Sequence, residues 1–173
     1  CTPGDYYVSP GDRFMIWPGG GQHFYGTLDN TICPANEKAY EYLDKIFTKE
    51  EQALIQTSAK GDEMVWLLWS MKEAAYKIYS RTTGVNSFAP TSLVCSNLSI
   101  HQQQATGVVT VANNNYHTQS NWNKDYVLSV AAKSEASLKE IKPLLYTQPN
   151  HVAYKHNSPK SVSHHGRYLA LAY

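Results

Sequence analysis

The sequence predicts an α+β protein in which helices pack on a small antiparallel sheet. Residues 36–81 repeat apolar side chains with the period of an amphipathic helix, whereas the chain beyond Gly84 alternates or runs apolar with many β-branched residues. Because helices precede a series of strands joined by short turns, antiparallel pairing is expected. Of the 173 residues, 42% are hydrophobic and only 17% are charged, which suffices for a core and argues against a disordered chain.

The first 25 residues differ in composition from the rest. Pro-Gly pairs punctuate two short apolar runs, at residues 6–8 and 14–17, and this pattern predicts strand, turn and strand. The Gly-rich stretch 18–21 lacks the spacing of a phosphate-binding loop, so it is interpreted as a plain loop. We therefore divide the chain into a Pro/Gly-rich N-terminal extension, residues 1–25, and one domain, residues 26–173.

Three helices are expected next. The first covers residues 36–47. Thr48 predicts the N-cap of a second helix, because Glu51 stands three residues later and completes a capping box. The third covers residues 63–81 and ends by Gly84, a residue that favours a helix C-terminus.

The second half of the chain is expected to form strands. They are predicted at residues 92–100, 107–112, 116–122 and 126–132, with a hairpin turn at 113–115. Residues 134–145 are weakly helical, with Pro143 ending or kinking that element, and 147–160 is a loop. Residues 161–173 are expected to form a buried strand interrupted by polar groups.

Charge and composition exclude several functions. The net charge is +1 and no Lys/Arg cluster is present, so nucleic acid is not an expected partner. No apolar run approaches the ~20 residues of a membrane span. The three cysteines are odd in number and widely spaced, which favours reduced thiols in the cytoplasm over a zinc site or disulfides. The start at Cys1 indicates a trimmed fragment, with a lipoprotein-type cysteine as the alternative.

Residues 69–77 read Trp-Ser-Met-Lys-Glu-Ala-Ala-Tyr-Lys and carry the candidate site. Glu73 and Lys77 are four residues apart and share a helix face, whereas Lys72 falls inside the apolar arc. An ordinary surface ion pair would explain Glu73 and Lys77 taken alone. The functional interpretation is that Glu73 binds a hard cation such as Mg²⁺ and that both lysines meet phosphate.

A second polar cluster, Ser-Val-Ser-His-His-Gly-Arg, occupies residues 161–167. On a strand, Ser161, Ser163 and His165 point to one side and His164 to the other. Their hydroxyl and imidazole groups can donate hydrogen bonds to a phosphate. A nucleophilic Ser163 is disfavoured, because the adjacent His164 has poor geometry for a base and no Gly-x-Ser-x-Gly turn exists.

Together the two clusters resemble the 4′-phosphopantetheinyl transferase superfamily. The resemblance rests on Trp-Ser-x-Lys-Glu-Ala-x-x-Lys at 69–77, Phe-x-Pro at 88–90 and the closing Ser-x-Ser-His-His-Gly at 161–166. It covers residues 40–90 and 161–173, and the serine-histidine strand comes last, as in the short single-module carrier-protein synthases. It implies the α+β fold of that family, with helices on a small antiparallel sheet.

The resemblance also implies roles for individual residues. Glu73 matches the motif glutamate, a Mg²⁺ ligand that is also implicated in activating the attacking serine. Lys72 and Lys77 match the two motif lysines, and Lys77 would contact the phosphates of coenzyme A. Ser163 and His164 match the pair that helps to hold the nucleotide. The implied reaction moves 4′-phosphopantetheine from coenzyme A to a serine of an acyl or peptidyl carrier protein, as in fatty acid biosynthesis.

The first metal ligand of the family departs from its usual pattern in this chain. The family opens with Gly-Ile-Asp, and the nearest text here is Gly-Thr-Leu-Asp-Asn at residues 26–30, which places Asp29 one residue late. Either Asp29 serves as the second Mg²⁺ ligand with altered geometry, or the metal site is incomplete.

Three hypotheses follow. The first is an active transferase, for which self-association is plausible because single-module relatives build their sites between subunits. The second is a protein of the same fold that binds a carrier protein or nucleotide without catalysing transfer. The third is an unrelated α+β module, such as an exported recognition domain, in keeping with the tyrosine- and asparagine-rich composition.

Overall fold

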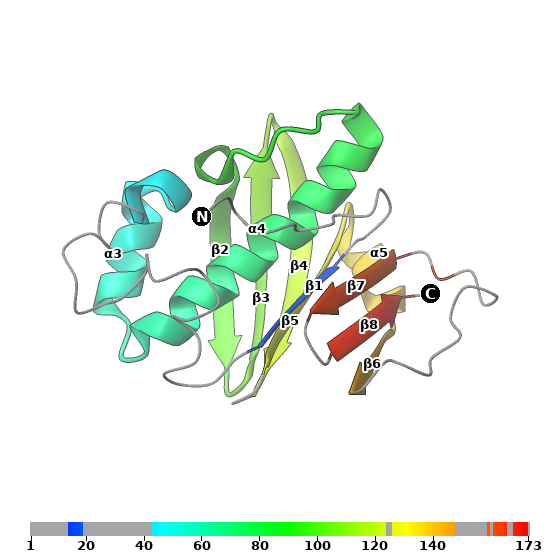
Figure 1. The fold of residues 1–173 in the computed structure, drawn as a ribbon. Coiled ribbons are helices and arrows are strands. Elements are labelled where there is room, and N and C mark those ends of the chain that lie inside the picture. The colour runs from blue at the N-terminus through cyan, green and yellow to red at the C-terminus, as the bar shows by residue number, and fades with distance from the viewer. Residues whose placement is uncertain are drawn as a thin grey trace.

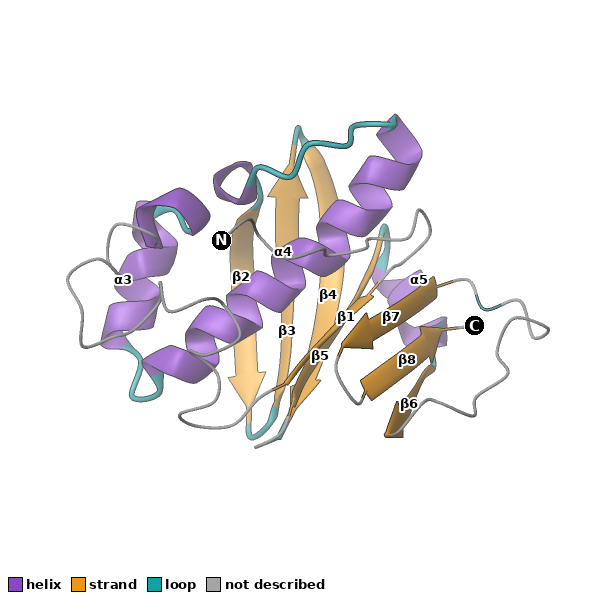
Figure 2. Ribbon diagram, in the orientation of Figure 1, coloured by secondary structure: helices purple, strands orange, loops and turns teal. Residues whose placement is uncertain are grey.

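The structure is a computed structural model that describes residues 14–18, 43–123, 126–147, 159, 161–165 and 168–172. Its helices are α3 (Lys49–Thr57), α4 (Gly61–Thr83), the 3-10 helix η2 (Pro90–Ser92) and α5 (Glu135–Glu140). Its strands are β1 (Phe14–Pro18), β2 (Val94–His101), β3 (Gln104–Val111), β4 (Asn114–Trp122), β5 (Tyr126–Ala132), β6 (Pro143–Thr147), β7 (Ser161–His165) and β8 (Tyr168–Ala172). Figure 2 shows the mixture of helices and strands, and the predicted α+β class is confirmed.

The main sheet has five antiparallel strands in the order β1-β5-β4-β3-β2. Helix α4 crosses one face of this sheet diagonally (Figure 1). A smaller antiparallel sheet, in the order β6-β8-β7, lies beside β1 and β5. Helix α4, which carries the candidate site, therefore packs on one face of the main sheet.

Strand β5 connects two hydrophobic cores. Val127 and Ala131 belong to the core beneath α4. Leu128, Val130 and Ala132, which alternate with them, pack in a second core with β8 and α5. Because successive strand residues point to opposite faces, one strand serves both cores, and this explains why every residue of β5 after Tyr126 is buried.

Helix α4 follows from its sequence. Its 23 residues are rich in helix-forming Glu, Met, Leu, Ala and Lys, and Asp62 and Glu63 complement the helix dipole in the first turn. It ends where Gly84 adopts φ 75°, with its N–H bonded to the Ser80 carbonyl. The helix predicted at 63–81 and its end by Gly84 are confirmed.

The cap predicted for the second helix is also present. The Glu51 N–H donates to the Thr48 hydroxyl at 3.3 Å, and the Thr48 N–H donates to the Glu51 carboxylate at 2.9 Å. This is the reciprocal capping box expected from the sequence. Of the helix expected at 36–47, residues 43–46 are helical and residues 36–42 lie outside the described part of the chain.

Three elements of the second half differ from prediction. The hairpin between β3 and β4 turns at Ala112 and Asn113, both with positive φ, one residue before the predicted place. Helix α5 ends at Glu140, and Pro143 begins strand β6, a position where a strand tolerates its missing N–H. The segment predicted as one terminal strand forms two, β7 and β8, which pair with each other.

Strand β1 lies within the segment that we separated as an N-terminal extension. It pairs with β5 over Phe14–Pro18, as the strand predicted at 14–17 requires. Residues 1–13 and 19–42 lie outside the described residues, so the boundary at residue 26 stays a prediction. Within the described ranges, no helix combines the length and apolar character needed to cross a bilayer.

Candidate functional site

The centre of α4 is buried on every side. Residues 70–78 are all buried, including the polar Ser70, Lys72, Glu73 and Lys77. Glu73 retains 8% of its surface and Lys77 7%. An exposed i,i+4 ion pair on an ordinary surface helix, the simplest explanation of these two residues, is therefore excluded by their burial.

The Glu73 carboxyl is in an unfavourable environment for its charge. Desolvation raises its pKa above the ordinary value, and the Lys77 ammonium opposes this only in part. Within the described residues, no side chain or backbone group donates a hydrogen bond to it. Because a buried carboxylate without donors is stabilised by a cation or by a proton, Glu73 is suited to metal binding and to proton transfer.

Lys72 lies on the same turn but points into the protein, with none of its surface exposed. Its ammonium donates hydrogen bonds to Glu51 Oε2 at 2.6 Å and to the carbonyls of Ile46 and Pro90, both at 2.9 Å. The Phe47 ring centroid lies 5.1 Å from the same nitrogen. An ammonium has three hydrogens, so each of them has a partner within the protein.

The Phe-x-Pro segment of the sequence packs against the same helix. The Phe88 ring meets Trp69 edge-on with centroids 5.5 Å apart, and it lies 4.8 Å from the Tyr76 ring. Pro90, two residues later, supplies one of the carbonyls that accept from Lys72. These two pieces of the family resemblance are therefore brought together in space.

A third buried group connects α4 to the sheet. The Ser70 hydroxyl lies 2.6 Å from that of Ser129 on β5, and Ser129 lies 2.7 Å from that of Ser120 on β4. All three side chains are fully buried. Ser70 also donates to the Leu67 carbonyl at 3.0 Å, so these hydroxyls satisfy one another where no water reaches.

The terminal cluster lies on β7. Ser161 and Ser163 are buried there, and the side chain of His164 lies outside what the structure describes. Strand β1 packs against both α4 and β7, so it is a shared neighbour of the two predicted halves of the site. The proximity of Ser163 and His164 to Glu73 stays a prediction.

Asp29, the predicted second metal ligand, also lies outside the described residues. Within the described ranges, no three acidic, histidine or cysteine side chains gather around a common point. Glu73 alone still fits Mg²⁺, because this ion is usually held by one or two carboxylates, with phosphate oxygens and water completing its shell. The desolvation of the Glu73 carboxyl, with no donor to it among the described residues, is the observation that supports this fit.

The sequence predicted Glu51 only as part of the capping box of α3, and it predicted no role for Ser120 and Ser129. The signal for Glu51 was present, because a lysine predicted inside an apolar arc requires a buried anionic partner. No such signal marked the two serines, since a strand pattern does not show which distant helix it will meet.

Comparison with known proteins is consistent with this geometry. A family model described as the 4′-phosphopantetheinyl transferase superfamily matches residues 29–131, a range that includes α3, α4 and the strands β2 to β5. No curated protein and no solved structure matches the chain. Since the family model covers more than half of the 173 residues, this chain belongs to the 4′-phosphopantetheinyl transferase superfamily and is a transferase of that type.

Proposed function

We propose that this protein transfers 4′-phosphopantetheine from coenzyme A to a serine hydroxyl of an acyl or peptidyl carrier protein, in a Mg²⁺-dependent reaction of the holo-carrier-protein synthase type. The observation that carries the proposal is the buried pair Glu73 and Lys77 on α4, at the positions of the family's motif. In this reaction the serine oxygen forms a bond to the pantetheine-side phosphorus. The phosphoanhydride bond breaks, and adenosine 3′,5′-bisphosphate leaves.

Lys77 is proposed to bind the pyrophosphate of coenzyme A. Its ammonium lies close enough to Glu73 to lower the pKa of that carboxyl, so the two side chains share one electrostatic environment. A cation in a desolvated place interacts strongly with phosphate oxygens, whose negative charge grows on the leaving group during transfer. Lys77 would therefore contribute to binding and to catalysis.

Glu73 is proposed to have two roles. With Asp29 it would hold Mg²⁺, which supplies charge neutralisation at the pyrophosphate when bound. When no metal ion is bound, its raised pKa makes it a better proton acceptor than an exposed glutamate. Both proposed roles draw on the burial of this carboxyl, to which none of the described residues donates a hydrogen bond.

The remaining assignments follow the family resemblance. Ser163 and His164 on β7 are proposed to hold the coenzyme A nucleotide. Lys72 was predicted to bind coenzyme A as well, but its ammonium donates to Glu51 and to two backbone carbonyls inside the protein. A cytoplasmic location and a homo-oligomer with sites between subunits are part of the proposal. A direct role in fatty acid biosynthesis depends on which carrier protein is the substrate.

The test is a transfer assay read by mass spectrometry. Incubation of the protein with coenzyme A, Mg²⁺ and an apo carrier protein should raise the mass of the carrier by one phosphopantetheine. Glu73→Gln should lower the rate at least ~100-fold, because it removes an interaction with developing charge. Glu63→Gln is the matched control, since Glu63 lies on the exposed first turn of the same helix.

The alternative function is binding without transfer. It predicts that the wild type binds coenzyme A or a carrier protein, as calorimetry would show, while the mass of the carrier stays unchanged with several apo carriers. That result would overturn the proposed transfer. Equal rates for wild type and Glu73→Gln, with intact folding by circular dichroism, would remove the roles given to Glu73.

A further inference from the structure

We propose that Glu51 and Lys72 form a positioning pair for α4 and that neither side chain touches the substrate. The proposal rests on the function proposed above, because what the pair positions is Glu73 and Lys77. It changes the role of Lys72 from a coenzyme A ligand to an internal support. It also gives a role to Glu51, which the sequence motif does not include.

Glu51 and Lys72 have all their hydrogen-bond partners within the protein and need no ligand. The three hydrogens of the Lys72 ammonium point to Glu51 and to the carbonyls of Ile46 and Pro90. The Glu51 carboxylate accepts from Lys72, from the Thr48 N–H at 2.9 Å and from the Cys95 N–H at 2.8 Å. Glu51 is 2% exposed and Lys72 is 0% exposed. A phosphate would have to enter the core and displace one of these partners.

The partners of Glu51 and Lys72 lie on several segments around α4. Ile46 ends the helical turn before α3, Thr48 is the cap of α3, Pro90 begins η2 and Cys95 lies on the edge strand β2. The pair therefore joins three separate segments, residues 46–51, η2 and β2, to one turn of α4. Because a buried charged pair is favourable only in good geometry, it tolerates little rotation or sliding of the helix.

The three residues before Glu73 on α4 contact three different elements of the fold. Ser70, Met71 and Lys72 are consecutive, so their side chains leave the helix about 100° apart. Ser70 meets the hydroxyl of Ser129 on β5, and Met71 packs so closely on β3 that a Cβ on Gly107 would lie 2.7 Å from its methyl carbon. Lys72 meets Glu51 on α3. The next residue, Glu73, leaves in the remaining direction, so its orientation is set by three contacts on the preceding residues.

This arrangement makes a kinetic prediction. A small displacement of Glu73 should slow the chemical step, about 10- to 100-fold, because misplacement of a reacting group is costly even when binding persists. Glu51→Gln and Lys72→Met should therefore lower kcat, while the KM for coenzyme A stays within about threefold of the wild type. The double variant should lower kcat no further than either single one, since both changes break the same contact.

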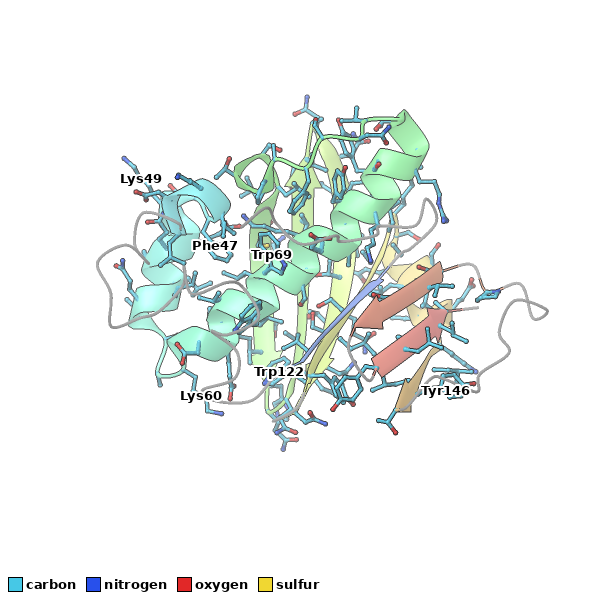
Figure 3. All side chains as sticks on the ribbon, in the orientation of Figure 1. Phe47, Lys49, Lys60, Trp69, Trp122 and Tyr146 are labelled. Carbon is cyan, nitrogen blue, oxygen red and sulfur yellow. The ribbon has the colours of Figure 1, made fainter. Side chains whose placement is uncertain are left out.

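Control variants distinguish a positioning role of Lys72 from direct binding of coenzyme A by Lys72. Lys49→Met removes a lysine that is exposed at the start of α3 and points away from the molecule (Figure 3), and it should have no effect. Lys77→Met should raise the KM for coenzyme A. If Lys72 contacts phosphate, Lys72→Met will also raise this KM, Glu51→Gln will leave it unchanged, and the two effects will add. A fall in Tm with unchanged kcat in Glu51→Gln, Lys72→Met and the double variant would mean that the pair is purely structural. Direct phosphate binding by Lys72 and a purely structural pair would each overturn the proposal.

The double variant also guards against misfolding, because it leaves no single charge buried alone. A further measurement needs no variant. In the wild type, the nitrogen-15 signal of the Lys72 ammonium should keep its chemical shift when adenosine 3′,5′-bisphosphate is added, whereas the Lys77 signal should move. A moving Lys72 signal would overturn the proposal. Absence of transfer by the wild type would instead refute the proposed function, so the two failures are distinguishable.

Discussion

Glu73, which we propose as the metal ligand, differs from its buried polar neighbours at the scale of one side chain. Lys72, Glu51 and the serines of α4 and the sheet are buried with their hydrogen-bonding capacity satisfied. Glu73 is buried with its pKa raised by desolvation and with only the charge of Lys77 opposing that rise. A buried carboxylate of this kind destabilises the protein when no ligand is bound, and a bound cation or a proton relieves that destabilisation. Such a residue is suited to metal binding and to proton transfer.

This cost has a measurable pH dependence. A carboxyl whose pKa is higher in the folded than in the unfolded protein binds its proton more tightly when folded. Its ionisation therefore lowers stability as pH rises from the unfolded pKa, near ~4.3, through the folded pKa, and the full loss persists above that. Glu73→Gln should raise the Tm at pH 7.5 without Mg²⁺, by ~2–4 °C for each 1 kcal/mol of relieved desolvation.

The gain should shrink as the pH falls and vanish below the unfolded pKa, where Glu73 is protonated in both states. Scanning calorimetry over this range measures it, with Glu63→Gln as the exposed control on the same helix. Added Mg²⁺ and coenzyme A should stabilise the wild type more than the Gln variant, because only the wild type keeps the carboxylate proposed to bind Mg²⁺. A lower Tm for Glu73→Gln at pH 7.5 would mean that Lys77 outweighs desolvation, contrary to this account.

At the scale of elements, the side chain of Met71 on α4 lies very close to one glycine of the sheet. Gly107 on β3 faces the Met71 side chain, which is completely buried. A Cβ there would also lie 3.3 Å from the Ser96 carbonyl oxygen. The missing side chain lets the helix and the strand approach each other, as expected for a glycine within a strand that packs closely on another element.

We therefore expect Gly107→Val to overpack this contact and to lower the free energy of unfolding by about 1–3 kcal/mol. Met71→Ala should create a cavity and cost about 2–5 kcal/mol alone. The double variant should lose less than the sum, because the space opened by one change accommodates the other. Urea unfolding measures all three. Additive losses would show that Gly107 and Met71 do not share this contact.

The helices and strands also show which features of the fold could be predicted from local sequence patterns. The capping box at Thr48, the length of α4 and its end at Gly84 depend on local rules, and they were predicted correctly. The last segment was predicted as one buried strand interrupted by polar groups, whereas it forms β7 and β8. Such a mixture of apolar and polar residues does not by itself show where a buried strand turns back on itself.

The whole molecule combines segments that are distant in the chain. Strand β1 from the first residues pairs with β5 and packs against both α4 and β7. The candidate site could be predicted at Glu73 and Lys77, since their spacing and their motif are both local. The pairing of Lys72 with Glu51 could not, because it depends on how α3 packs on α4. The same holds for Ser70 and the serines of β4 and β5.

Family membership and burial together define the central claim, that the acid and amine of α4 hold Mg²⁺ and the pyrophosphate of coenzyme A. Electron paramagnetic resonance with Mn²⁺ in place of Mg²⁺ tests it most directly, since bound Mn²⁺ loses the sharp signal of the free ion. In the presence of coenzyme A, the wild type and Glu63→Gln should each bind one Mn²⁺ per chain, and Glu73→Gln should bind none. Equal Mn²⁺ binding by Glu73→Gln and the wild type would contradict the claim.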